Sequence, residues 1–328
     1  MSQEKSFQMN RRQVLAAGVA VAAGSMIPGL NLMAEEESPL KGKLRKAMIV
    51  GKLTAKELQP LKDAGFDGVE TMNCVPAEAE KDRKIADDIG LKVHSVLRGW
   101  MSFNSDVETK VDETIEQTRD ALRSAKIYGA DAILLVPCRV GGLEMPKPED
   151  FDIEFDEKTG HVTRVAKGDN EKYAKYIKAQ NDSTDGTKKA VEKLIPLAAE
   201  LGVIIGLENV WNNLWCSAEL YANMVGSFKN PWVKAYYDIG NHVKYSPPEH
   251  WVKTLGKLIC KLHIKDFKID RENKSGGRFV HPRDGQINWP AVRRELSNAE
   301  YDGWATIEDG GLPLPEFAKR FDLIASGK

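Results

Sequence analysis

The stretch AAELGVIIGLEN, residues 198 to 209, contains the pattern that decides the fold. A helical segment stops at Gly202, a short apolar strand follows, and the strand ends on a carboxylate, Glu208. Glycine accepts the left-handed conformation that closes a helix, which explains its place between the two segments. A buried, unpaired carboxylate is costly, so Glu208 needs a cation, a proton or access to water.

The same order of helix, glycine and apolar strand recurs along the chain. It is seen in LKDAGFDGVETM (61–72), ADDIGLKVHSV (86–96) and IYGADAILLVP (127–137). Further candidate strands are KAMIVG (46–51), VKAYYDIGN (233–241), LICKLHIKDF (258–267) and WATIEDGG (304–311). Strands that alternate with helices predict a parallel sheet, and eight of them are typical of a (β/α)8 TIM barrel. A doubly wound sheet is the alternative, but the glycine-rich phosphate motifs of such folds do not occur.

The first 34 residues differ in composition from the rest of the chain. Arg11 and Arg12 precede a weakly apolar run of 14 residues (14–27), which is shorter than the roughly 20 that a spanning helix needs. Paired arginines, a mild apolar run and Ala34 before an acidic segment predict a twin-arginine-type signal peptide over residues 1–34. An uncleaved anchor is the alternative. We expect a periplasmic protein, without stable membrane insertion after signal removal, and a single barrel domain over 35–328.

Composition favours a small-molecule partner. The net charge of −1 and the absence of a basic stripe argue against nucleic acid and against a membrane surface. The hydrophobic fraction of 42% suits one large globular domain, and a homo-oligomer is compatible with it. The four cysteines form no CxxC pair, and we expect the three that lie in or beside predicted strands to pack as small apolar side chains.

One interval between the fourth and fifth strands is unusually long. Residues 143–182 contain FDIEFDEKTGHVTRVAKG (151–168), in which apolar residues alternate on either side of a turn, and the next helix is expected near Thr184. This pattern predicts a β-hairpin inserted in a βα-loop. Such loops lie on the catalytic face of a barrel, so the hairpin is expected either to wall the pocket or to be an exposed decoration.

Four of the later strands end in a side chain that can bind a metal: Glu208, Asp238, His263 and Glu308. In a barrel, the C-terminal strand ends meet at the catalytic face, so these side chains should share one rim. Taken singly, such a carboxylate is usually solvated or ion-paired, and a lone histidine is usually a core residue. Together they predict one divalent ion. Oxygen-rich ligands suit Mn²⁺, which we favour, Mg²⁺ or Co²⁺, and the imidazole also allows Zn²⁺.

These four strand ends, with GFDGVE (65–70) and DGQINWPAV (284–292), resemble the sugar phosphate isomerase/epimerase family of xylose isomerase-like TIM barrels. That family includes ketose 3-epimerases, hydroxypyruvate isomerases and inosose dehydratases. The resemblance implies that Glu208, Asp238, His263 and Glu308 hold the metal and that the two glutamates are the catalytic acid and base. Two motifs depart from the epimerases. HIKD (263–266) looks closer to the dehydratases, and Asn241 and His242 stand where epimerases have DxxH, which makes both candidates for substrate binding.

Further substrate-binding candidates lie on the same predicted face. Lys265 shares the inward face of its strand with His263 and could bind a sugar oxygen or pair with a carboxylate. Glu70 could orient a ligand or form a structural ion pair. His94 and Trp100 could form a sugar-facing wall, although Trp100 could equally be core. Arg283 belongs to the loop after the seventh strand and could close over the ligand.

The predicted site favours sugar isomerase or epimerase chemistry. A metal that acidifies the C–H beside a carbonyl supports an enediolate, and two glutamates can move the proton. The same start allows elimination, so a lyase or dehydratase acting on a keto-sugar or inosose is the first alternative. A metal-assisted hydrolase and a non-catalytic periplasmic sugar-binding protein are further alternatives. A DNA-repair endonuclease of the same barrel type would need more strand-end histidines than a chain with six His offers.

Overall fold

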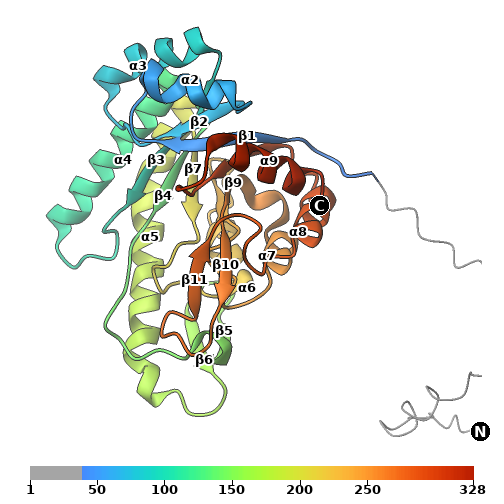
Figure 1. The fold of residues 1–328 in the computed structure, drawn as a ribbon. Helices are drawn as coiled ribbons and strands as arrows, with labels where there is room; N and C mark the ends of the chain where they lie inside the picture. The colour runs from blue at the N-terminus through green and yellow to red at the C-terminus, as the bar shows by residue number, and fades with distance from the viewer. Residues whose placement is uncertain (1–38) are drawn as a thin grey trace, which may run out of the picture. The chain divides into compact units, whose positions relative to one another are not determined.

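The computed structural model describes residues 39–328, and the predicted signal peptide lies outside them. Residues Leu40–Lys328 form one compact unit. Eight parallel strands close into a barrel in the order β1-β12-β9-β8-β7-β4-β3-β2 (Figure 1). Their bounds are β1 Leu44–Val50, β2 Gly68–Thr71, β3 Lys92–Trp100, β4 Ala132–Val136, β7 Ile204–Glu208, β8 Val233–Asp238, β9 Ile259–Ile264 and β12 Gly303–Ile307. The predicted TIM barrel and its eight strands are confirmed.

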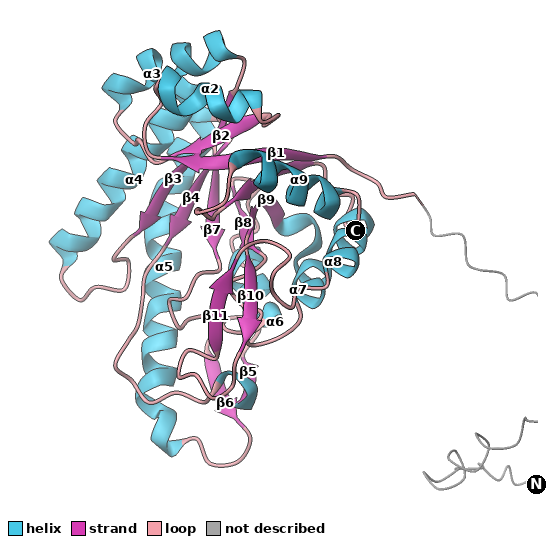
Figure 2. Ribbon diagram, in the orientation of Figure 1, coloured by secondary structure: helices cyan, strands magenta, loops and turns pink. Residues whose placement is uncertain are grey.

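Helices follow the strands and surround the barrel, as Figure 2 shows. They are α2 Ala55–Asp63, α3 Pro76–Ile89, α4 Glu108–Tyr128, α5 Ala174–Leu201, α6 Ala218–Gly226, α7 Pro248–Leu255, α8 Trp289–Asn298 and α9 Leu314–Ala325, with short 3-10 turns at Pro148–Asp150, Glu171–Tyr173 and Gly256–Leu258. Gly90, Gly129 and Gly202 cap α3, α4 and α5 in the left-handed conformation. The expected glycine stops are therefore present. None of the helices in residues 39–328 has the length and apolar character of a membrane span.

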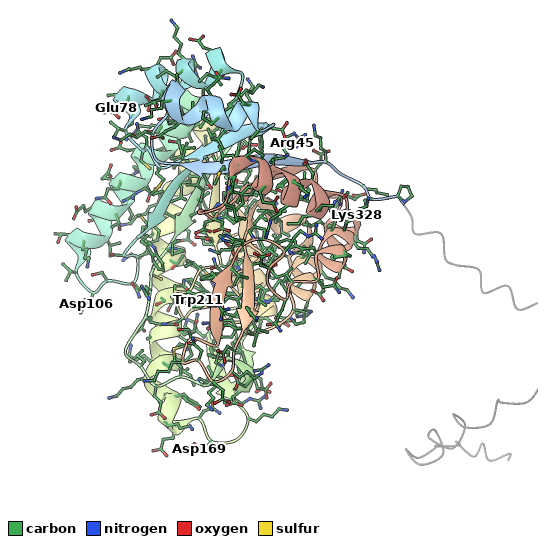
Figure 3. The ribbon with its side chains drawn as sticks, viewed as in Figure 1. Arg45, Glu78, Asp106, Asp169, Trp211 and Lys328 are labelled. Atoms are coloured by element: carbon green, nitrogen blue, oxygen red, sulfur yellow. The ribbon has the colours of Figure 1, made fainter. Side chains whose placement is uncertain are left out.

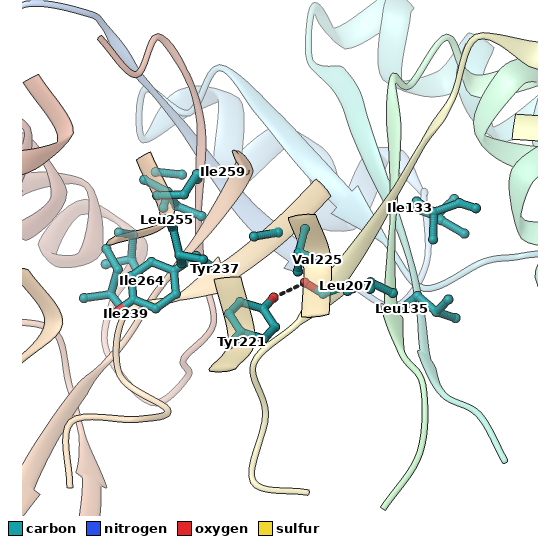
Figure 4. Close-up of a cluster of buried hydrophobic side chains, with 14 of the residues drawn as sticks. Ile133, Leu135, Leu207, Tyr221, Val225, Tyr237, Ile239, Leu255, Ile259 and Ile264 are labelled. Atoms are coloured by element: carbon teal, nitrogen blue, oxygen red, sulfur yellow. Dashed lines mark hydrogen bonds between the residues drawn. The ribbon is translucent and has the colours of Figure 1, made fainter. Parts of the chain in front are cut away.

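The main core lies between the strands and the helices. Leu207 of β7 and Val225 of α6 are buried there, and Tyr221 of α6 donates a hydrogen bond to the Leu207 carbonyl (Figure 4). A separate small cluster of Leu134, Val136 and Tyr236 fills part of the barrel. Because one face of each strand packs on helices, the other face is free to carry polar groups toward the barrel axis.

The inserted hairpin is present as β5 Phe151–Phe155 and β6 Val162–Ala166, which pair antiparallel. The predicted start of the next helix near Thr184 is wrong, because α5 already begins at Ala174. The turn-forming residues NDSTDG (181–186) are helical because tertiary contacts use them. Asn181 exchanges hydrogen bonds with the Val162 backbone, and Gly186 allows close packing, since a Cβ there would lie 2.4 Å from the Phe103 carbonyl oxygen.

A second hairpin, which the sequence analysis did not predict, extends the chain beyond β9. It consists of β10 Asp266–Ile269 and β11 Gly277–Val280. Figure 1 shows it following directly on β9, at the end of the barrel where the strands terminate. Trp211, labelled beside this hairpin in Figure 3, packs against Phe267 at 5.5 Å and Phe279 at 4.7 Å between ring centroids. The hairpin is thus braced by an aromatic cluster on the catalytic face.

Candidate functional site

The structure brings the four predicted ligand-type side chains together at one rim. Glu208 and Asp238 are the last residues of β7 and β8, His263 lies one residue before the end of β9, and Glu308 follows β12 directly. One ligand atom from each residue lies within 4.8 Å of those from the other three. Glu208, Asp238 and His263 are buried, whereas 37% of the Glu308 side chain is exposed. Glu308 therefore links the cluster to solvent.

The imidazole of His263 is held in a defined orientation. Its Nε2 lies 2.6 Å from Glu70 Oε2, while its Nδ1 lies 2.9 Å from Glu308 Oε2 and 3.8 Å from both Glu208 Oε1 and Asp238 Oδ2. An Nε2–H that donates to Glu70 leaves Nδ1 directed at the three carboxylates, the arrangement that metal-binding histidines adopt. Glu70 is completely buried, and its other oxygen accepts from Ser95. Glu70 thus orients His263, one of the two roles expected for it.

Two polar side chains flank the carboxylates. Lys265 Nζ lies 2.8 Å from Glu308 Oε2 and 3.1 Å from Asp238 Oδ2. Burial alone would lower the pKa of Lys265, but the Asp238 and Glu308 carboxylates raise it above its usual value. Asn241 donates its backbone N–H to Asp238 Oδ1 and its side-chain amide to Glu208 Oε1 at 3.3 Å. Lys265 and Asn241 therefore both contact the cluster, and for Lys265 this is the carboxylate pairing expected as an alternative to substrate binding.

The electrostatics of the cluster favour an additional cation. Burial raises the pKa of Glu208 to about 8 and that of Asp238 to about 7. Burial also acts to raise the pKa of Glu308, but its hydrogen bonds with His263 and Lys265 hold the value well below the usual range. A nearby divalent ion would relieve the cost of ionising all three carboxylates.

The geometry also fits a metal ion. Asp238 Oδ2 is buried and accepts no hydrogen bond from the described residues, although Lys265 Nζ lies near it. Three oxygen donors and one nitrogen donor form a set that suits several divalent cations. Ligands about 2.0–2.2 Å from one ion lie a few ångströms apart, close to the spacing found in this cluster.

A cavity of about 600 Å³ opens from the rim. It is lined by Lys265 and Glu308 together with residues of β10, β11 and the loops after β11 and β12, namely Lys268, Arg278, Phe279, Val280, His281, Asp284 and Asp309. Its volume suits a small organic ligand. No residue of the β5–β6 hairpin lines this cavity, so that insertion does not wall it.

The family assignment follows from the sequence match. A family model described as a xylose isomerase-like TIM barrel matches residues 58–320. The chain belongs to this family. No curated protein matches the chain in sequence.

Several solved structures share this xylose isomerase-like fold. A 3-keto-D-glucoside 4-epimerase from E. coli is 13% identical, with a TM-score of 0.63 over 86% of this chain and 99% of that chain. A D-tagatose 3-epimerase-like protein is 16% identical, with a TM-score of 0.64 over 86% and 98%. A probable 3-DHS dehydratase from Bacillus anthracis is 14% identical, with a TM-score of 0.59 over 86% and 98%. At these identities the likeness establishes the shared barrel.

The proposed wall of His94 and Trp100 is not formed in this xylose isomerase-like barrel. His94 is buried, stacks on Trp304 at 4.5 Å, and lies 3.0 Å from Thr306 Oγ1 through Nε2. Burial lowers its pKa well below the usual value, as expected for a core histidine. Trp100 is 47% exposed at the end of β3, with the Arg139 guanidinium 5.4 Å from its ring. The two side chains therefore occupy different environments.

His242 is also a core residue. Its Nε2–H donates to the Val210 carbonyl at 3.2 Å, and its ring lies 4.7 Å from that of Trp251. Burial lowers the pKa of His242 to about 3. Arg283 has an exposed side chain that does not line the cavity, and its backbone N–H donates to Asp266 at 2.9 Å. The substrate-binding roles expected for these two residues are thus not supported.

Asp266, the last residue of the HIKD motif, organises the loop that follows the hairpin. Its carboxylate accepts backbone N–H groups of Phe267, Arg283 and Ile287, and also the Trp289 indole N–H. Burial raises its pKa, while these hydrogen bonds oppose the shift. The motif therefore combines a candidate metal ligand, a cation and a loop anchor, and only the first two roles were foreseen.

Proposed function

We propose that this protein is a divalent-metal-dependent sugar isomerase or epimerase that acts on a ketose or keto-sugar. The observation that carries the proposal is the convergence of Glu208, Asp238, His263 and Glu308 within 4.8 Å, beside a cavity that Glu308 lines. The fold shared with a D-tagatose 3-epimerase-like protein and a 3-keto-D-glucoside 4-epimerase supports it. Mn²⁺ is the favoured ion.

The four residues would hold the ion, which when bound would acidify the C–H next to a sugar carbonyl. Glu208 and Glu308 come from β7 and from the end of β12, with β8 and β9 between those strands in the barrel, so their carboxylates approach the centre from different sides. Each carboxylate can accept a proton at one position and return it at another. Lys265 lines the cavity beside Glu308, so its ammonium can also donate a hydrogen bond to a developing oxyanion.

A lyase that eliminates water or another β-substituent is the second candidate. It too begins with removal of a proton next to the carbonyl. The fold shared with a probable 3-DHS dehydratase favours it, as does the HIKD motif, which places Lys265 beside Glu308. An ammonium at this position can stabilise the departing oxygen. Turnover in D₂O, with the mass of the product measured, separates the two candidates.

Turnover of keto-sugars and inososes in D₂O tests the proposal. We expect deuterium on the carbon next to the carbonyl, in an isobaric product for an isomerase or epimerase and with a mass loss for a lyase. Glu208→Gln and Glu308→Gln remove a base but keep a ligand oxygen, so they should stop exchange more completely than they weaken metal binding. Glu192→Gln, at an exposed position of α5, is the matched control and should exchange normally.

Hydrolysis requires no such exchange. Product formed with neither carbon-bound deuterium nor an eliminated group would contradict the proposed chemistry. Internal return of the proton must first be tested with a substrate labelled at that carbon, because direct return would leave no solvent label.

A further inference from the structure

The β10–β11 hairpin carries two cations that face each other. Lys268 of β10 and Arg278 of β11 are direct partners in the antiparallel register. Like charges directly opposite each other destabilise such a pair. Both side chains are exposed and line the same cavity as Lys265 and Glu308. The arrangement is unfavourable for the hairpin alone and becomes favourable when an anion lies between the two cations.

The other charges around the cavity are already balanced. Each acid that lines it has a cationic or ionisable partner: Asp284 with Arg320 at 2.7 Å, Asp309 with His281 at 2.7 Å, and Glu308 with Lys265 at 2.8 Å. Lys268 and Arg278, by contrast, form no ion pair or side-chain hydrogen bond within residues 39–328. The hairpin wall of the cavity therefore carries two uncompensated positive charges.

The hairpin presents these cations from a rigid support. Gly277 has φ +145, and a Cβ there would lie 2.2 Å from the Lys268 carbonyl oxygen, so only glycine lets β11 approach β10 this closely. Phe267 is fully buried and packs on Trp211. Binding groups held on braced strands lose less conformational entropy than groups on free loops.

We propose that Lys268 and Arg278 form an anion subsite that binds a phosphate or carboxylate group carried by the substrate. The inference rests on the proposed function, because it places the reacting end of the sugar at Glu308 and the anionic end at the hairpin. A guanidinium can bind two anionic oxygens at once, and an ammonium supplies a third contact. The position inside the catalytic cavity favours a small acidic sugar as the ligand.

Binding of matched fragments tests the subsite without requiring turnover. Isothermal titration calorimetry on the metal-loaded protein compares glycerol 3-phosphate, glycerate and glycerol, which differ in the charged group. The variants are Lys268→Gln and Arg278→Gln. Lys274→Gln is the matched control, because it removes a positive charge from the exposed end of the same hairpin, outside the cavity.

We expect at least one anionic fragment to bind about tenfold or more tightly than glycerol, with the preferred anion identifying a phosphate or a carboxylate. Loss of a charge-assisted contact should weaken that binding about tenfold in each cavity variant and less than about twofold in Lys274→Gln. The subsite is refuted if neither anion binds more tightly than glycerol. It is also refuted if the cavity variants behave like the control. Failure of deuterium exchange would contradict the proposed reaction and leave this binding result standing.

Discussion

The variant His242→Gln should lose less stability on acidification than the wild-type protein does. His242 is 2% exposed, and burial lowers its pKa from 6.5 to about 3. Between these values the unfolded chain binds a proton that the folded protein does not, so stability falls as the pH falls below about 6.5. At pH 5.0 the difference is about 1.5 pH units, or about 2 kcal/mol. Glutamine cannot be protonated but can still donate to the Val210 carbonyl.

Urea unfolding at pH 7.5 and pH 5.0, in the presence of a chelator, measures this effect. The loss of unfolding free energy between the two pH values should be about 2 kcal/mol larger in the wild type than in His242→Gln. His250→Gln changes an exposed histidine that is paired with Glu219 and should behave like the wild type. Equal losses in wild type and His242→Gln would refute the assignment of His242 as a neutral core residue.

Two further predictions concern the metal and export. Glu70→Gln should weaken metal affinity about 10-fold to 100-fold in a chelator competition. The variant lacks the charged acceptor that orients His263, whose Nε2 lies 2.6 Å from Glu70 Oε2. Unchanged affinity would contradict that role. We also propose that the protein is exported to the periplasm by the twin-arginine route. Replacement of both Arg11 and Arg12 by lysine should then leave the precursor in the cytoplasm, as measured by immunoblot of cell fractions. Normal export of this variant would contradict the proposal.

The barrel and its rim could be predicted from the sequence because local signals determine them. Glycine stops such as Gly129 and Gly202 mark the ends of helices, and the apolar runs that follow are long enough to read as strands. Once the strands are counted, topology places all their C-terminal ends at one face. The approach of Glu208 to Glu308, 100 positions later in the chain, follows from that topology.

The environment of individual histidines could not be predicted in this way. Val69 pairs with Val93 but Glu70 pairs with Ser95, so the register of β2 and β3 shifts at His94. Such a shift changes which side chains face the barrel axis, and no local sequence pattern indicates it. The burial of His242 likewise depends on contacts outside its own turn, such as that with Trp251 of α7, whose ring lies 4.7 Å away.

The β10–β11 hairpin was missed for a different reason. Each of its strands has only four residues, and this is too short for alternation to stand out. The pair Gly276–Gly277 before RFV (278–280) is the signal that could have revealed it, since glycine pairs often mark turns beside short strands. Asp266, the acid of the HIKD motif, could not be recognised as a loop anchor before its distant N–H donors were placed.

Metal analysis of the purified protein tests most directly whether Glu208, Asp238, His263 and Glu308 hold one divalent ion. The wild type should retain about one ion per chain, and Asp238→Ala or His263→Ala should lower occupancy and melting temperature together, because binding to the folded state stabilises it. Asp106→Ala, at an exposed position far along the sequence from the cluster, should change neither. Full occupancy in both cluster variants, or a wild type that retains no divalent ion, would contradict the assignment.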